Sequence, residues 1–211
     1  MSHRYRLRLT ALVSGLVLLC AAPATAGREL HGRQVGPALN RLAWSSAGTY
    51  VLGDSITAEG SAVLQARRPR WTINGVHGRL VSTLPLMIAN VRAVDQRPFR
   101  VVIELGSNQT ARWSKADYAA AIAALPTSTR VLLVTPYKEP GGHWAPKGVL
   151  ATARYAHWMQ QVARERPHTC VVPWRGRAGA HPEWLRDGLH PTDDGYVQWA
   201  DLILQTDSTC R

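Results

Sequence analysis

A serine, an aspartate and a histidine stand out because their types and spacing suit nucleophilic chemistry. Ser55 ends the tripeptide GDS, directly after a short apolar run. Asp187 and His190 are three residues apart, so the carboxylate can reach one imidazole nitrogen and leave the other free. A serine hydroxyl needs a base to take its proton, and that base is usually a histidine oriented by a carboxylate. The sequence therefore offers a nucleophile and a base, although GDS by itself is equally typical of a turn.

Hydrogen-bond donors for a developing oxyanion are the next requirement of such a site. Asn108 lies in ELGSNQ, residues 104–109, after another apolar run, and its side-chain amide can donate. The backbone N–H of Ser55 is a second donor if a helix begins there. A third donor is a glycine of NGVHGR, residues 74–79, where either Gly75 or Gly78 is available.

Five short apolar runs are predicted to be the strands that position these residues. They are residues 49–53, 71–76, 100–106, 130–136 and 169–174. Their Val, Ile and Leu residues do not alternate with polar ones, which is typical of strands covered on both faces. Helical patterns follow them at residues 58–68, 78–92, 114–125, 147–166 and 192–205, with Ser114 and Thr192 as N-caps and Pro85 as a kink or break. The alternation predicts an α/β fold whose parallel sheet presents functional residues at its strand ends.

Four segments together resemble the sequence blocks of the SGNH hydrolases, also called the GDSL-type esterase/lipase superfamily. They are GDS, the glycine in NGVHGR, GSN and DGLH, and they occur in the family's order. The resemblance covers nearly all of the chain after residue 26. It implies a flavodoxin-like three-layer α/β/α sandwich with a five-stranded parallel sheet.

The resemblance also implies a role for each candidate residue. Ser55 would be the nucleophile, His190 the general base and Asp187 the partner of His190. The oxyanion hole would consist of the Ser55 N–H, a glycine N–H and the Asn108 side chain. We align Gly78 with the family's glycine, because GR after the loop looks like the family's helix start.

The sequence departs from the family pattern at three positions. Ile56 follows the serine where the family often has leucine, which is a mild change. Gln109 replaces an aspartate that often follows the asparagine, so that carboxylate is not there to brace the loop. Thr57 stands at the last position of GDSIT, so the G-x-S-x-G elbow of ordinary α/β-hydrolases is absent.

The first 26 residues have the pattern of a secretory signal peptide. Three arginines precede an apolar run, and small residues 24–26 offer a cleavage site near Ala26. Cys20 does not suit a lipoprotein signal, because Leu19 stands where a small residue is needed. We therefore expect a secreted protein without a stable membrane anchor, in which residues 27–211 form a single SGNH hydrolase domain.

The chain is basic, with 25 Lys and Arg against 14 Asp and Glu and a net charge of +11. Such a charge on an exported protein favours an anionic cell-wall surface as a partner, or is simply a soluble basic surface. Nucleic acid is not expected, because the basic residues are scattered and the protein is exported. We expect a monomer.

Two cysteines follow the signal segment, Cys170 and Cys210. In an oxidising compartment such a pair usually forms a disulfide, which here would tie the C-terminal end of the chain to a strand. The other possibility is one buried thiol and one thiol in a frayed tail.

The predicted function is that of a secreted serine esterase acting on short, acetyl-like esters, which include acylated polysaccharides. No cofactor or metal is expected. The alternatives are acyl transfer to a sugar by the same site, and a non-catalytic module that binds glycan or cell wall. Two further interpretations of Asp187 and His190 are a helix-preceding acid beside a solvent-facing histidine, and a metal site completed by Asp193 and His181.

Tryptophans in or near predicted loops are candidates for substrate contacts. They are Trp113, Trp144, Trp174 and Trp184. An exposed indole can stack on a sugar or an acyl chain, whereas burial between helix and sheet is the commoner use. The loop at residues 137–148, which contains Trp144, either shapes the site or is a passive connection.

Overall fold

The computed structural model describes residues 48–211, except for residues 109–111 and 145–146. The predicted signal peptide, residues 1–26, and the start of the predicted domain, residues 27–47, therefore lie outside the described residues. The described part contains a single five-stranded sheet in the order β2-β1-β3-β4-β5. Its strands are β1 (Thr49–Gly53), β2 (Thr72–Gly75), β3 (Arg100–Glu104), β4 (Arg130–Val134) and β5 (Thr169–Val172), and every pairing is parallel. This confirms the predicted α/β fold with a five-stranded parallel sheet.

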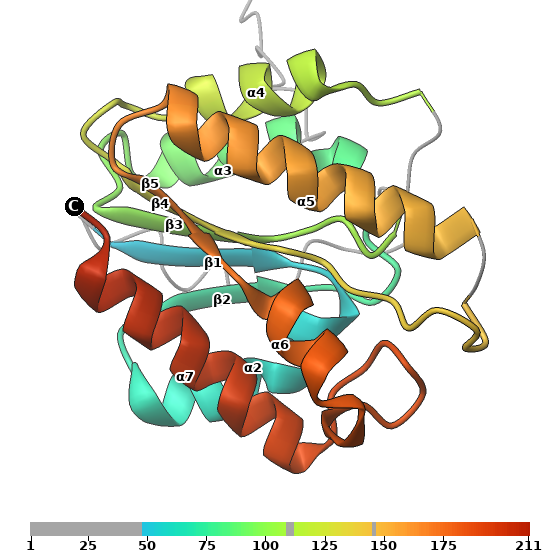
Figure 1. Ribbon diagram of the computed structural model, residues 1–211. Helices are drawn as coiled ribbons and strands as arrows, with labels where there is room; N and C mark the ends of the chain where they lie inside the picture. Colours follow the sequence, from blue (N-terminus) through green and yellow to red (C-terminus); the bar gives the residue numbers. More distant parts are fainter. Residues whose placement is uncertain (1–47, 109–111, 145–146) are drawn as a thin grey trace, which may run out of the picture.

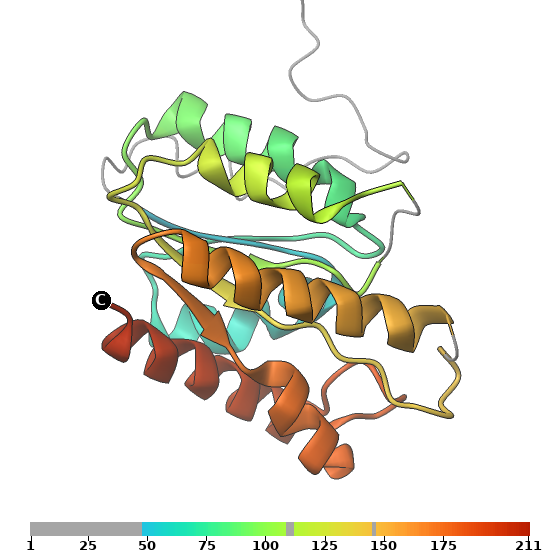
Figure 2. The same ribbon diagram turned by 45° about the horizontal axis from the view of Figure 1, so that its top comes forward.

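Within the described residues, six α-helices cover the two faces of the sheet, as predicted for a three-layer sandwich (Figures 1 and 2). They are α2 (Ser55–Arg67), α3 (Leu84–Val94), α4 (Lys115–Ala123), α5 (Lys147–Glu165), α6 (Trp174–Ala180) and α7 (Asp193–Thr209). Helices α3, α4 and α5 lie on one face, and α2, α6 and α7 lie on the other.

Strand β3 shows why these strands read as continuous apolar runs. Val101 and Ile103 belong to the core under α3–α5, whereas Val102 belongs to the core under α2 and α7. All three side chains are fully buried. Because both faces are covered, the three central residues of the strand are apolar, and its charged residues, Arg100 and Glu104, stand at its two ends.

The helix ends follow the local signals in the sequence. Ser114 caps α4 in a reciprocal capping box with Asp117, and Thr192 caps α7 by accepting the Gly195 N–H. Pro85 lies in the first turn of α3, where a missing N–H leaves no hydrogen bond unmade, and the short 3-10 helix η1 (Val81–Thr83) precedes it. The expected break at Pro85 is therefore the start of α3.

A disulfide joins Cys170 in β5 to Cys210 at the end of α7, with the two Cα atoms 5.8 Å apart. It closes a span of 40 residues and restricts the unfolded chain, which is worth about 4 kcal/mol in the chain-entropy model. The bridge holds the last helix against the edge strand.

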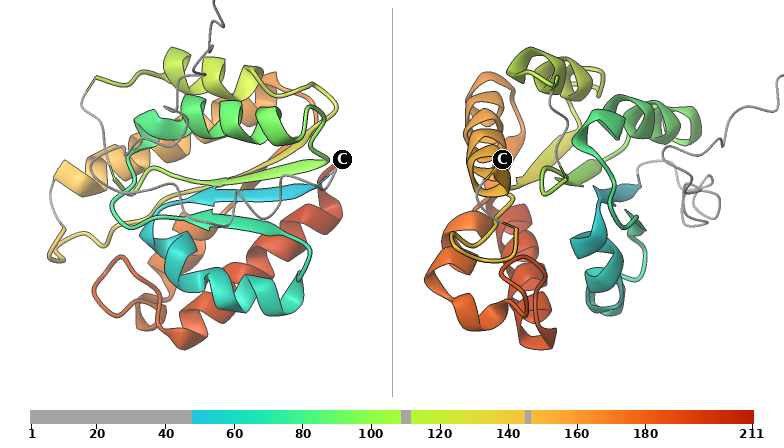
Figure 3. Two further views of the ribbon diagram at one scale, coloured as in Figure 1. Left: turned by 180° about the vertical axis from the view of Figure 1, so that it is seen from behind. Right: turned by 90° about the vertical axis from the view of Figure 1, so that its right-hand side faces the viewer.

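The loops that carry the candidate residues gather at the edge where the strands end. This edge is on the right in Figure 1 and faces the viewer in the right panel of Figure 3, whereas the C-terminus lies at the opposite edge. In the described part of the chain, no helix is both long and apolar enough to cross a bilayer.

Candidate active site

Ser55, His190 and Asp187 form a continuous hydrogen-bonded chain in the structure. The Ser55 Oγ lies 2.9 Å from His190 Nε2, and His190 Nδ1 lies 2.8 Å from Asp187 Oδ2. Ser55 is the first residue of α2, which begins directly after β1 and the N-cap Asp54. The serine and the histidine are 135 residues apart in sequence, so the fold has to bring them together. A hydroxyl, an imidazole and a carboxylate in this order can pass a proton from the serine to the histidine.

The carboxylate of Asp187 is held in its charged form by the turn that contains His190. One of its oxygens accepts the backbone N–H groups of Leu189 and His190, at 3.0 and 2.7 Å. Burial acts to raise the pKa of Asp187, but the hydrogen bonds from His190 and Leu189 outweigh it and leave the pKa below its ordinary value. A carboxylate that stays ionised can keep the Nδ1 proton in place and stabilise a positive imidazolium.

The turn itself is closed on both sides. Leu185 and Pro191 form an isolated antiparallel bridge, and the Arg186 N–H donates to the His190 carbonyl at 3.0 Å. Glu59, one turn beyond Ser55 on α2, binds the Arg186 guanidinium and accepts the Tyr196 hydroxyl. Glu59 thus ties the serine helix to the histidine turn, a role that sequence analysis missed because it depends on contacts with residues more than 120 positions away.

Asn108 is hydrogen-bonded to Asp54, the residue that precedes Ser55. The Asn108 side-chain amide donates to Asp54 Oδ2 at 3.3 Å, and Asp54 Oδ1 accepts the Ile56 N–H at 3.1 Å. An amide nitrogen carries two hydrogens, so this contact leaves one available to another acceptor. Asp54 is fully buried, and burial raises its pKa to about 6.

A second buried acid, Glu104, faces Asp54 at the end of β3. The two side chains are hydrogen-bonded to each other, and the Thr57 hydroxyl donates to Glu104 at 3.0 Å. Burial, followed by the charge of Asp54, raises the pKa of Glu104 well above its usual range. The hydrogen bond between the two acids raises the pKa of Glu104 and lowers that of Asp54, so Glu104 is the member of the pair that holds a proton more tightly.

The two candidate glycines occupy different surroundings. Gly75 is the last residue of β2 and pairs with Gly53, and a Cβ atom there would lie 2.2 Å from the Ala58 backbone nitrogen. Gly75 is therefore needed for the close approach of strand and helix. Gly78 lies in the following loop at φ +70°, with open space where a Cβ would be.

Arg79, next to Gly78, braces that loop. Its buried guanidinium donates to the carbonyl oxygens of Gly53 and Asn74, at 2.8 and 2.7 Å. Burial lowers its pKa to about 10, so it remains charged at neutral pH. This role could not be predicted from the sequence, because it depends on how β1 and β2 end side by side.

The loop after β4 also reaches the site. The Glu139 N–H donates to the Gly188 carbonyl at 2.8 Å, and the Trp144 ring lies edge-to-face against the His190 ring, with centroids 6.0 Å apart. Lys138, which is only 6% exposed, places its ammonium over the Trp144 ring. The loop therefore shapes the site.

The other three loop tryptophans pack against the protein itself and differ in how deeply they are buried. Trp174 is buried in α6 and stacks on Trp184, and Trp184 stacks in turn on His181. Trp113 packs partly buried against the core near Tyr118.

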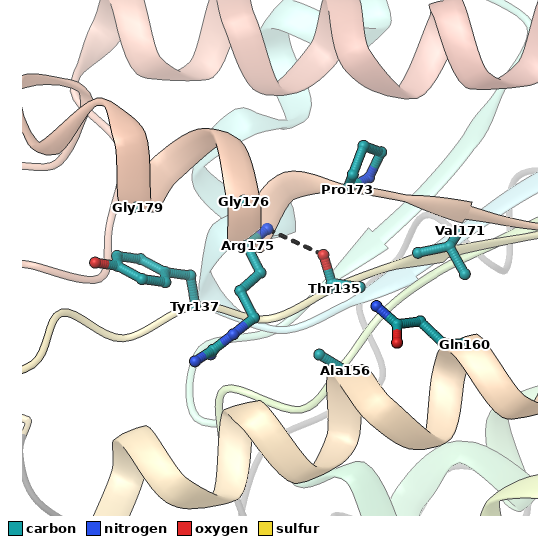
Figure 4. Close-up of a pocket in the computed structure, with 9 residues that line it drawn as sticks. All are labelled: Thr135, Tyr137, Ala156, Gln160, Val171, Pro173, Arg175, Gly176 and Gly179. Atoms are coloured by element: carbon teal, nitrogen blue, oxygen red, sulfur yellow. Dashed lines mark hydrogen bonds between the residues drawn. The ribbon is translucent and has the colours of Figure 1, made fainter.

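A hollow of about 410 Å³ lies apart from these residues, between α5 and α6 beside the ends of β4 and β5 (Figure 4). Thr135 in its floor accepts the Arg175 N–H at 3.0 Å, and the Arg175 guanidinium lies near the Tyr137 ring. Its lining contains no carboxylate, histidine or cysteine. The hollow therefore lacks a base to pair with a nucleophile.

No group of three or more His, Cys, Asp or Glu residues within the described ranges is arranged to hold a metal ion. His181, which the sequence allowed as a ligand beside Asp187, instead contacts Glu183 at 2.9 Å. Asp193 is an exposed residue of the first turn of α7.

Comparisons with known proteins identify the family and the fold of this chain. The family model of the GDSL-like Lipase/Acylhydrolase family matches residues 51–198. The C-terminal catalytic domain of Streptococcus pneumoniae peptidoglycan O-acetyltransferase A, solved with a methylsulfonyl adduct, is 25% identical with a TM-score of 0.68, over 78% of this chain and 94% of that domain. Comparison with curated protein sequences gives no match.

Two more distant structures share the fold. A GDSL-like lipase from Bacteroides thetaiotaomicron is 18% identical with a TM-score of 0.62, over 83% of this chain and 97% of that one. The psychrotrophic esterase EstA from Pseudoalteromonas is 16% identical with a TM-score of 0.56, over 78% of this chain and 98% of that one. The family match, which covers most of the chain, and the shared fold show that this protein belongs to the GDSL-like lipase/acylhydrolase family.

Proposed function

We propose that this protein is a secreted serine ester hydrolase that works through Ser55, His190 and Asp187. The observation that carries the proposal is the hydrogen-bonded chain between these three side chains, in a member of an acylhydrolase family. Ser55 attacks the ester carbonyl while His190 Nε2 takes its proton. Asp187, whose pKa is lowered, keeps the Nδ1 proton in place and stabilises the imidazolium.

The oxyanion that forms is bound by the N–H groups of Ser55 and Gly78 and by the Asn108 amide. Ser55 opens α2, so its N–H has no acceptor one turn earlier and points from the positive end of the helix. Gly78 is favoured over Gly75, because the position where a Cβ would lie is open at Gly78, whereas the backbone of α2 fills it at Gly75. Asp54 positions the Asn108 amide through the hydrogen bond described above.

Collapse of the intermediate returns the proton from His190 to the leaving alcohol and leaves an acyl group on Ser55. Water then attacks the acyl-enzyme with the help of the same histidine, which releases the acid. In these steps the chain supplies the nucleophile, the base and the oxyanion donors, and water is the second nucleophile. The compact domain favours short acyl groups such as acetyl, and its positive charge favours acylated polymers of an anionic cell wall as substrates.

Acyl transfer to a sugar is the second candidate function. It is favoured by the likeness to the catalytic domain whose name describes a peptidoglycan O-acetyltransferase. The same acyl-enzyme would serve both reactions, and the acceptor, water or a sugar hydroxyl, would distinguish them.

Hydrolysis of ethyl and p-nitrophenyl esters from acetyl to palmitoyl, by wild type and Ser55→Ala, tests the proposal. We expect wild type to prefer the shortest esters and Ser55→Ala to lose activity by a factor on the order of 10⁴ or more. An added sugar acceptor that takes the acyl group faster than water does would establish transfer. Equal rates for the two proteins would contradict any role of Ser55 as nucleophile.

A further inference from the structure

Trp144 is a partly exposed aromatic side chain that borders the candidate base. Its ring lies 6.0 Å from the His190 ring, in an edge-to-face arrangement, and 36% of the residue is exposed. The His143 ring packs edge-to-face against it at 5.1 Å. Single large apolar side chains are common on protein surfaces. Trp144 differs from these because it lies beside the reacting groups.

The protein fixes the position of this indole from two sides. The Lys138 ammonium lies 5.2 Å from the Trp144 ring centroid, within the range of a cation–π contact. The Glu139 N–H bonds the Gly188 carbonyl, so the loop is attached to the turn that carries Asp187 and His190. An aromatic ring held rigidly loses little entropy when a ligand stacks on it.

The chemistry of the proposed reaction decides which half of the ester meets this ring. The oxyanion donors, Ser55, Gly78 and Asn108, follow the ends of β1, β2 and β3, where they define the side of the carbonyl oxygen. The leaving alcohol must lie next to His190, because Nε2 returns its proton to that oxygen. A side chain in contact with the His190 ring is therefore adjacent to the alcohol half of the substrate.

We propose that Trp144 is a stacking platform for a pyranose ring in the alcohol half of the ester, so that the preferred substrates are O-acylated sugars. This rests on the proposed function and names its substrate class. The apolar C–H face of a pyranose suits an indole, whereas a small alkyl alcohol would leave most of the ring uncovered. Trp144 is thus a specificity residue.

The test compares two acetate esters that differ only in the alcohol, methyl 6-O-acetyl-glucopyranoside and ethyl acetate. We expect Trp144→Ala to reduce the ratio of their kcat/KM values at least tenfold, mainly through KM of the sugar ester. Trp144→Phe, which keeps an aromatic face, should recover most of that ratio. Trp158→Ala is the matched control, because Trp158 also carries a cation on its ring, Arg154, but lies on α5 against Tyr155. Its ratio should equal that of wild type.

An unchanged ratio in Trp144→Ala would overturn the proposal. The proposal would also be overturned if Trp144→Ala changed the preference between ethyl acetate and ethyl butyrate but left the ratio of sugar ester to ethyl acetate unchanged. The indole would then face the acyl group.

Failure of ester hydrolysis itself would be a separate result, and the platform would still be tested by binding. In Ser55→Ala, the indole N–H signal of Trp144 in the NMR spectrum should shift when methyl 6-O-acetyl-glucopyranoside is added, while that of Trp158 should not. A Trp144 signal that stays in place would overturn the platform, whatever the reaction proves to be.

Discussion

Acidic side chains flank Ser55 on two sides, and the protein treats the two sides in opposite ways. Asp187 lies in a turn, where hydrogen bonds from His190 and Leu189 leave its pKa below the ordinary value. Asp54 and Glu104 lie beneath the serine helix, where burial raises both pKa values. The same functional group is thus kept charged on one side of the nucleophile and made to share a proton on the other.

The difference shows how position sets the task of a carboxyl group. Asp187 must offset the charge that develops on His190, so it has to be ionised throughout the reaction. Asp54 and Glu104 instead hold the backbone of α2, Thr57 and Asn108 in place by hydrogen bonds. One proton shared between the two acids lets them lie side by side without repulsion between two negative charges. We infer that Asp187 stabilises the positive charge on His190, and that Asp54 and Glu104 fix the positions of the groups around Ser55.

Asp187→Asn should have the largest effect. The amide cannot hold His190 in the required tautomer, so we expect kcat to fall by a factor on the order of 10⁴. Asp194→Asn, an exposed change in the first turn of α7, is the matched control and should keep wild-type kinetics. A kcat for Asp187→Asn within tenfold of wild type would remove the distinction between the two acidic groups.

Asp54→Asn should have a smaller effect, because it disturbs the placement of Asn108 rather than the charge on His190. We expect kcat to fall about 10- to 100-fold, with Asn108→Ala costing about 10²- to 10³-fold. If Asp54 acts through Asn108, the double variant should be no slower than Asn108→Ala alone. Losses that simply multiply would show that Asp54 acts independently.

Glu104→Gln should change stability more than activity. A glutamine can donate to Asp54 as the protonated acid does, so we expect kcat at pH 7 within a few-fold of wild type. The raised pKa of Glu104 means that its contribution to stability is complete below the unfolded-state pKa and is lost as the pH rises through the folded-state pKa. Asp54 contributes in the same direction between about pH 4 and its raised pKa of about 6.

Thermal unfolding from pH 4 to pH 9 measures this difference. The Tm of wild type should fall relative to that of Glu104→Gln as the pH rises above about 4.3, the unfolded-state pKa of a glutamate, because the glutamine does not titrate. Glu165→Gln, which removes an exposed partner of Lys115, should stay parallel to wild type. Parallel curves for wild type and Glu104→Gln would show that Glu104 is not a buried acid with a raised pKa.

The sequence predicted the parts of the fold that depend on local patterns. The existence and order of the five strands, the N-caps at Ser114 and Thr192 and the pairing of Cys170 with Cys210 agree with the structure, although the fifth strand, predicted at residues 169–174, ends at Val172. Helix α6 was not predicted, because WRGRAGA contains two glycines in seven residues. It is stabilised by tertiary packing of Trp174 and Ala178, which local propensity does not reveal.

The site residues that could be predicted are Ser55, which directly follows a strand, and Asp187 and His190, which are three residues apart in sequence. The contact between Asp54 and Glu104 was not, because it requires the β1–β3 register that pairs Gly53 with Glu104. The position of Lys138 over Trp144 likewise depends on how a loop folds back on the histidine turn. Such contacts between distant residues leave no periodic trace in the sequence.

The identity of the nucleophile is the central claim, and covalent labelling tests it most directly. Wild type, Ser55→Ala and His190→Ala would be treated with a fluorophosphonate ester, and the intact mass and the modified peptide would be determined by mass spectrometry. We predict one adduct per wild-type chain, on Ser55, with none in Ser55→Ala and much slower labelling in His190→Ala. A label on another residue, or equal labelling of wild type and His190→Ala, would contradict the account.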